Sequence, residues 1–115
     1  MTKARALLAC AVACGLMMVG PTAAISQEAR SPQAIAKIKI VDFAFMPATI
    51  SVPRGTLVGW KNFGSVGHTT TSDDGRWDSG TLLPGDIFGV RFRVAGSYSY
   101  HCAIHSFMTG TVVVT

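Results

Sequence analysis

The chain has 115 residues, of which 49% are hydrophobic and 14% are charged, and its formal net charge is +4 at pH 7. This length accommodates one small domain with one hydrophobic core. So weak a positive charge does not indicate a nucleic-acid-binding protein. The chain has three cysteines, two of them near its beginning. Whether the third can form a disulfide depends on the redox conditions of the compartment in which the protein resides.

Residues 1–26 have the layout of a secretory signal peptide. Two basic residues precede an apolar run over 6–19, and small residues follow as far as Ser26. The run has 14 residues, fewer than the roughly 20 that cross a bilayer as a helix. We therefore expect cleavage near Ser26, a periplasmic location and no stable membrane association. A retained anchor and lipid attachment at Cys10 or Cys14 are the alternatives.

Cleavage would leave residues 27–115, with 89 residues, eight lysines and arginines and six acids, for a net charge near +2. The only cysteine in this part is Cys102. Without a second cysteine it cannot form an internal disulfide, so the thiol must be paired externally, buried or used chemically. We expect the mature protein to be a monomer.

Short runs of alternating apolar and polar residues follow a polar lead-in at 27–36, and no helical period is present. Alternation with frequent Val, Ile, Thr and aromatic residues predicts β-strands, and the intervening Gly, Pro, Asn and Asp residues predict turns. Many short strands in so small a domain predict an all-β fold, a Greek-key antiparallel β-sandwich over 37–115. The expected strands are 37–43, 48–53, 56–62, 86–94, 97–102 and 110–115.

Cys102, His105 and Met108 recur at every third residue near the end of the chain. Alternation along the preceding strand places His101 on the opposite face from Cys102, so His101 is not expected to share a site with it. A continuing strand would also send residues three apart to opposite faces, so a common target requires a turn after Cys102. Gly110 then gives the chain a flexible exit into the last strand.

A thiolate, an imidazole and a thioether are soft metal ligands, and His68 offers a second imidazole from a loop 34 residues upstream. Two histidines and one cysteine with a weak axial methionine are typical of blue-copper electron-transfer sites. Zinc is the rival metal. Two metal-free alternatives are an inert buried cysteine and a Cys102 nucleophile with His105 or His68 as its base.

Further motifs surround these residues: FAFMP at 43–47, WKN at 60–62, GSYSY at 96–100 and GTVVV at 110–114. With them, residues 38–115 resemble a small cupredoxin. The spacing Cys102-x2-His105-x2-Met108 is most similar to that of amicyanin, whose ligand loop is the shortest in the family. The resemblance implies that His68, Cys102 and His105 bind one copper ion in a plane and that Met108 binds it axially. It also implies an electron carrier that cycles between Cu(II) and Cu(I), and not an enzyme.

Three residues depart from the pattern of these relatives. Thr69 follows the first histidine, where relatives commonly have an asparagine that ties two ligand loops together. Ile104 and Ser106 stand where amicyanin-like loops often carry prolines. We therefore expect the surroundings of the ligands to differ from those in relatives, and with them the reduction potential.

The resemblance further implies transient redox partners, a donor dehydrogenase or a cytochrome acceptor, reached through His105. Small, weak contacts suit such partners. A copper storage or delivery module is the alternative, although the chain has no tail rich in histidine or methionine. Trp60 and Trp77 are expected to pack in the core or in loops. The expected docking patch around His105 comprises Phe45, Met46, Pro47, Ala103, Ile104 and Phe107.

Overall fold

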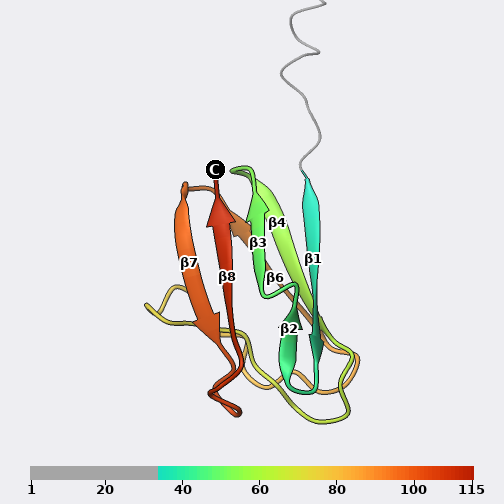
Figure 1. Cartoon of the computed structure of the whole chain (residues 1–115). Helices are drawn as coiled ribbons and strands as arrows, with labels where there is room; N and C mark the ends of the chain where they lie inside the picture. The colour runs from blue at the N-terminus through green and yellow to red at the C-terminus, as the bar shows by residue number, and fades with distance from the viewer. Residues whose placement is uncertain (1–33) are drawn as a thin grey trace, which may run out of the picture. The chain divides into compact units, whose positions relative to one another are not determined.

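The computed structural model describes residues 34–115, and within these residues strands are the only regular secondary structure (Figure 1). The predicted signal peptide and most of the lead-in lie outside the described residues. The first strand begins at Ile35, inside the predicted lead-in. Within residues 34–115 no helix has the length and apolar character needed to cross a membrane. The strands are β1 (Ile35–Val41), β2 (Ala44–Met46), β3 (Thr49–Val52), β4 (Thr56–Asn62), β5 (Thr71–Ser72), β6 (Ile87–Phe92), β7 (Gly96–His101) and β8 (Thr109–Val114).

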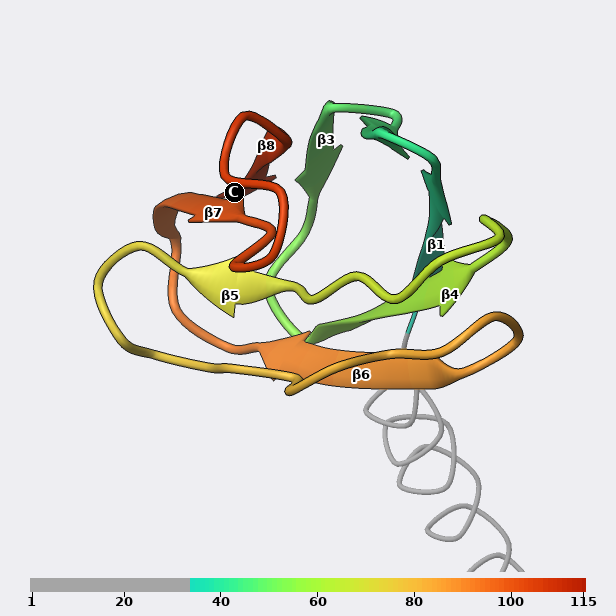
Figure 2. The same ribbon diagram turned by 90° about the horizontal axis from the view of Figure 1, so that it is seen from below.

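The strands form two four-stranded sheets, in the orders β2–β1–β4–β6 and β3–β8–β7–β5 (Figure 2). This confirms the predicted all-β sandwich. The sheets are mixed, however, because β1 pairs with β4 in parallel and β3 pairs with β8 in parallel. After β2 the chain crosses to the second sheet to form β3. It then returns to the first sheet to form β4, which runs beside β1 in the same direction. Alternation patterns predict strands but not the direction of their neighbours, so the antiparallel prediction was wrong for these two pairs.

Large side chains from both sheets fill the space between the layers. Trp60 on β4 and Tyr100 on β7 are fully buried, and their ring centroids lie 5.4 Å apart in an edge-to-face arrangement. Trp77 packs 5.9 Å from Trp60, which confirms the predicted packing role of both tryptophans. Aromatic pairs of this kind contribute about 0.5–1.5 kcal/mol beyond the area they bury.

Strand β7 presents the faces that its alternation predicts. Tyr98, Tyr100 and Cys102 point inward and are buried, whereas His101 is half-buried and its Nδ1 lies 2.6 Å from Asp73 Oδ1. Opposite Tyr100, a Cβ at Gly110 would overlap the tyrosine ring. Gly110 is therefore required for the close packing of β7 and β8, which is a different reason from the chain flexibility expected from the sequence.

The loop that follows β4 and the turn that follows β7 lie at the same end of the sandwich, opposite the C-terminus (Figure 1). Each continues a strand of a different sheet, so the two layers bring residues far apart in the sequence to one place. This end carries the predicted ligands.

Candidate metal centre

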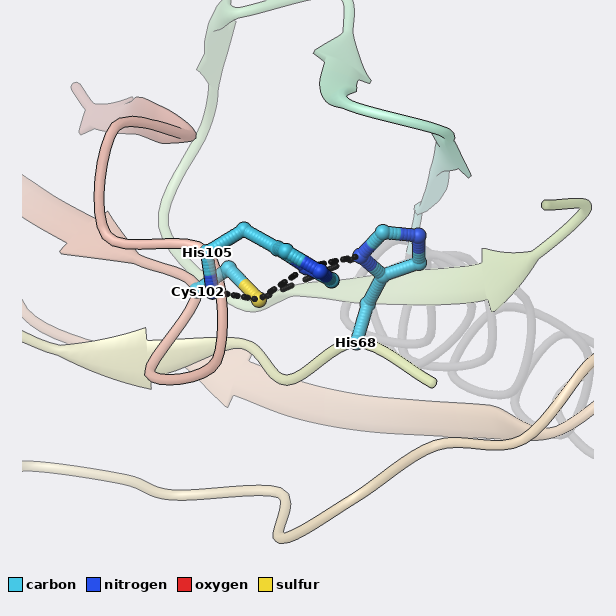
Figure 3. Close-up of side chains that lie close together, drawn as sticks. All are labelled: His68, Cys102 and His105. Atoms are coloured by element: carbon cyan, nitrogen blue, oxygen red, sulfur yellow. Dashed lines mark hydrogen bonds between the residues drawn. The ribbon is translucent and has the colours of Figure 1, made fainter. Parts of the chain in front are cut away.

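Three of the four predicted ligands converge at this end of the sandwich (Figure 3). The Sγ of Cys102 lies 3.9 Å from Nδ1 of His68 and 3.8 Å from Nδ1 of His105. The two Nδ1 atoms are 3.2 Å apart. Cys102 and His68 are fully buried, whereas His105 is half-buried. The three donor atoms thus surround one point just beneath the surface.

The backbone around His68 is fixed by a short bridge to a second loop. The N–H of His68 donates to the Leu82 carbonyl at 3.1 Å, and the N–H of Leu82 donates to the His68 carbonyl at 2.7 Å. The buried side chain of Asn62, the last residue of β4, donates to the carbonyls of Val66 and Leu82 at 2.9 and 2.8 Å. These bonds hold the histidine in place before any metal binds.

The turn predicted after Cys102 is present and closed by two backbone hydrogen bonds. The N–H of Cys102 donates to the Met108 carbonyl at 3.0 Å, and the N–H of Met108 donates to the His105 carbonyl at 2.9 Å. Met108 is 2% exposed. The turn therefore buries Met108 and holds its backbone against that of Cys102 and His105.

The environment of Cys102 favours the thiolate. Burial alone would raise the pKa of the thiol. The backbone N–H groups of Thr69, His105 and Ile104 and the His68 ring outweigh burial and lower that pKa from 9.0 to about 6. The Thr69 and His105 N–H groups lie 3.3 and 3.4 Å from Sγ. Because the thiolate is the form of cysteine that binds metals, these donors prepare the residue for ligation.

Thr69 also connects the two segments that carry the ligands. Its Oγ1 accepts a hydrogen bond from the N–H of Ala103 at 2.7 Å and lies 2.8 Å from Oγ1 of Thr71. The residue following Cys102 is thereby tied to the residue following His68. A threonine thus makes the inter-loop connection that the resemblance assigns to asparagine.

Asp42, at the end of β1, holds the far side of the His68 ring. Its Oδ1 lies 2.8 Å from His68 Nε2, and its Oδ2 accepts hydrogen bonds from the backbone N–H and the hydroxyl of Ser65. The Ser65 hydroxyl and His68 lower the pKa of Asp42 well below its usual range. No spacing pattern connects Asp42 to His68, 26 residues away, so sequence reasoning missed this residue.

The donor set fits copper. With Nε2 donating a proton to Asp42, His68 presents the Nδ1 lone pair toward His105 and Cys102. A cation between two imidazole nitrogens and a thiolate would relieve the close approach of these electron-rich atoms. Two imidazoles, a thiolate and a nearby thioether are the ligands of a blue-copper site.

One residue of the predicted docking patch was misplaced. Phe45 is 2% exposed and packs 4.7 Å from the Tyr100 ring, because its inward position on β2 belongs to the core. Phe43, in the turn between β1 and β2, is 50% exposed instead. Its ring lies 5.1 Å from His105 and 6.0 Å from Phe107. The other predicted members are exposed: Met46, Pro47, Ala103, Ile104 and Phe107.

Comparisons with known proteins agree with this geometry. The family described as "Cupredoxin-like domain" matches residues 8–114. The chain belongs to the cupredoxin family. An amicyanin from Paracoccus denitrificans is 31% identical, with 99% of both chains aligned. An amicyanin-alpha from Methylorubrum extorquens is 28% identical, with 92% of this chain and 98% of the relative covered.

A solved structure of a purple cupredoxin from Nitrosopumilus maritimus also superposes on this cupredoxin. The TM-score is 0.64 and the identity is 31%, over 70% of this chain and 99% of the other. Cupredoxins bind type 1 copper, and the group formed by His68, Cys102 and His105 is suited to that ion.

Proposed function

We propose that this cupredoxin is a periplasmic carrier of single electrons between redox proteins, with His68, Cys102, His105 and Met108 as its copper ligands. The observation that carries the proposal is the convergence of three donor atoms from two buried residues, His68 and Cys102, and one half-buried residue, His105. The periplasmic location rests on the predicted signal peptide.

Bound copper supplies a reversible one-electron couple between Cu(II) and Cu(I). The protein keeps the ligands in place as the charge changes. The bridge between His68 and Leu82, the closed turn from Cys102 to Met108 and the tie made by Thr69 all restrict movement of the donors. A rigid site reorganises little when an electron arrives, and small reorganisation favours fast transfer.

The half-buried ring of His105 offers the short route to a partner. Around it, Phe43, Ile104 and Phe107 are 50%, 49% and 70% exposed. We call these three side chains, together with Met46, Pro47 and Ala103, the docking face. A small surface made largely of apolar side chains suits transient partners, a donor dehydrogenase or a cytochrome acceptor, that must separate quickly.

Voltammetry and copper transfer together test the proposal. A carrier loaded with copper should show a reversible one-electron wave and retain Cu(I) in the presence of a competing chelator. A storage or delivery protein should release Cu(I) readily instead, which would contradict the proposal. Cys102→Ser is the control, because it removes the thiolate while preserving the size of the side chain.

A further inference from the structure

We propose that the outer face of β1, β4 and β6 is a second docking surface, which binds an acidic protein partner. This inference does not depend on copper binding. A groove of about 470 Å³ crosses this face. Strand β6 forms one edge of this sheet, next to β4. The groove therefore lies beside a sheet edge that a partner can reach.

Two glycines form the floor of the groove. Gly59 on β4 pairs with Gly89 on β6, and Gly59 also pairs with Lys37 on β1. Two of the three positions in this row across the sheet therefore have no side chain. Glycine in the middle of a strand costs roughly 0.5–1 kcal/mol relative to alanine, so a pair of facing glycines calls for a reason.

Within residues 34–115, no atom close to either glycine supplies that reason. A Cβ at Gly59 would meet no closer atom than the Phe88 carbonyl oxygen at 4.0 Å, and one at Gly89 would lie 3.5 Å from Leu57, an ordinary contact distance. Gly64 and Gly110 differ, because a Cβ at either would overlap a neighbouring side chain. Glycine within a strand often marks a place where a ligand or another chain approaches the backbone closely.

Apolar side chains flank the floor on both sides. Ile35 pairs with Leu57 in the row on one side, and Ile87 pairs with Lys61 in the row on the other. Ile35 and Ile87 are 65% and 68% exposed. Such exposed apolar residues around a concave surface are typical of interaction sites.

Among the described residues, the charged side chains that line the groove are all positive: Lys37, Lys39 and Lys61. The three rows contribute four cationic side chains, Lys37, Lys39, Lys61 and Arg91, and no acid. Lys39 and Lys61 also place their Nζ atoms 5.6 and 5.0 Å from the ring centroid of Phe63, which is 55% exposed. The amino groups are thus gathered at one side of the groove and have no carboxylate among these rows to neutralise them.

This combination points to a partner segment that carries carboxylates on either side of an apolar side chain. The apolar side chain would rest on the floor made by Gly59 and Gly89, and the carboxylates would pair with the lysines that line the groove, Lys37, Lys39 and Lys61. Complementary charge of this kind steers encounter and fixes the register of a complex. The copper-ligand end stays free for electron exchange, because the floor lies in the middle of the sheet.

An NMR titration tests the inference. The probe is the peptide acetyl-Glu-Glu-Leu-Phe-Leu-Glu-Glu-amide, added to nitrogen-15-labelled mature protein, both metal-free and loaded with Cu(I). We expect amide shifts concentrated in 57–61 and 87–91 in both forms. We also expect binding to weaken at higher salt, since salt screens exposed charges. An absence of shifts on this face would overturn the proposal.

Gly59→Val fills the floor and should weaken peptide binding at least tenfold. Open space above Gly59 and the strand preference of valine make this variant compatible with the fold. The matched control is Ser99→Val, which adds the same side chain at an exposed position of β7. Equal binding by Gly59→Val and the unmodified protein would contradict the role of the floor.

Two further results would replace the acidic protein partner with another occupant. Binding to phosphatidylglycerol vesicles but not to the peptide, lost in Gly59→Val, would identify an anionic lipid surface as the occupant. Concentration-dependent self-association lost in the same variant would identify a second copy of this chain. Lys61→Glu reverses one positive charge beside the groove. It should therefore weaken binding of the acidic peptide wherever the peptide binds this face.

Discussion

Asp42 holds His68 in the orientation that a metal ligand needs, with Oδ1 at 2.8 Å from Nε2. Asp42→Asn retains an oxygen of similar position but removes the negative charge that makes the imidazole a stronger donor. We predict metal binding weakened by about 10- to 100-fold, as is common when a partner of a ligand is replaced. Cu(II) should be affected more than Cu(I), so the reduction potential should rise. Competition titration and voltammetry measure the two effects.

The chain contains a matched control for this substitution. Asp73 also pairs with a histidine, His101, but that pair lies on the outer side of β7 and not at the metal centre. Asp73→Asn should leave copper affinity and potential unchanged. Gly64→Ala should reproduce the Asp42→Asn effects, because its Cβ would overlap the Asp42 carboxylate. Equal potentials in Asp42→Asn and the unmodified protein would show that the pair has only a structural role.

The hydrogen bond between Thr69 and Ala103 should contribute to the stability of the protein and to the rigidity of the ligands. Thr69→Val keeps the shape of the side chain but removes the acceptor of the part-buried N–H of Ala103, at a cost of about 0.5–1.5 kcal/mol. We predict a lower unfolding free energy of the metal-free protein and slower electron self-exchange. Thr69→Ser retains the hydroxyl and serves as the control. Unfolding by denaturant and NMR line broadening provide the measurements.

The metal-free protein should become less stable as the pH falls toward 6. The pKa of Cys102 is lowered on folding, from 9.0 to about 6, so the folded state favours the thiolate more than the unfolded state does. The resulting stabilisation is complete above about pH 9, declines as the pH falls, and is absent below about pH 6. Cys102→Ala should lack this dependence. Denaturant unfolding between pH 5 and 9 measures it, and parallel pH profiles for the two proteins would refute the shift.

A charge on the docking face should slow electron exchange without affecting the copper site. Phe107→Asp places a carboxylate at a position that is 70% exposed and 6.3 Å from the His105 ring, measured between centroids. Self-exchange requires two such faces to meet, and like charges there should slow it by about tenfold. Val94→Asp is the control, at a position that is 66% exposed between β6 and β7. Unchanged self-exchange in Phe107→Asp would exclude this face.

The regular part of the fold could be predicted from the sequence because each strand carries its own signal. Alternation along 97–102 correctly placed Cys102 inside and His101 outside, and the spacing to His105 and Met108 correctly required a turn. Direction of pairing has no such local signal, so the parallel pairs of β1 with β4 and β3 with β8 were missed. The two-residue strand β5 is too short to produce a pattern at all.

The surroundings of the ligands were harder to predict, because they depend on contacts between distant residues. Phe43 and Phe45 are equally apolar, and only the position of β2 decides that the second is buried and the first lies beside His105. The contact of Asp42 with His68 likewise requires knowing that the end of β1 lies beside the loop after β4. Thr69 could be identified as a departure from relatives, but its hydrogen bond to Ala103 could not.

The visible absorption spectrum of the mature protein with Cu(II), recorded before and after adding a reductant, tests the central claim most directly. We predict an intense visible band that bleaches on reduction and returns on oxidation, since the band requires a bond between copper and the Cys102 thiolate. Cys102→Ser should bind copper without this band. A colourless complex with the unmodified protein, or a band that persists in Cys102→Ser, would contradict the account.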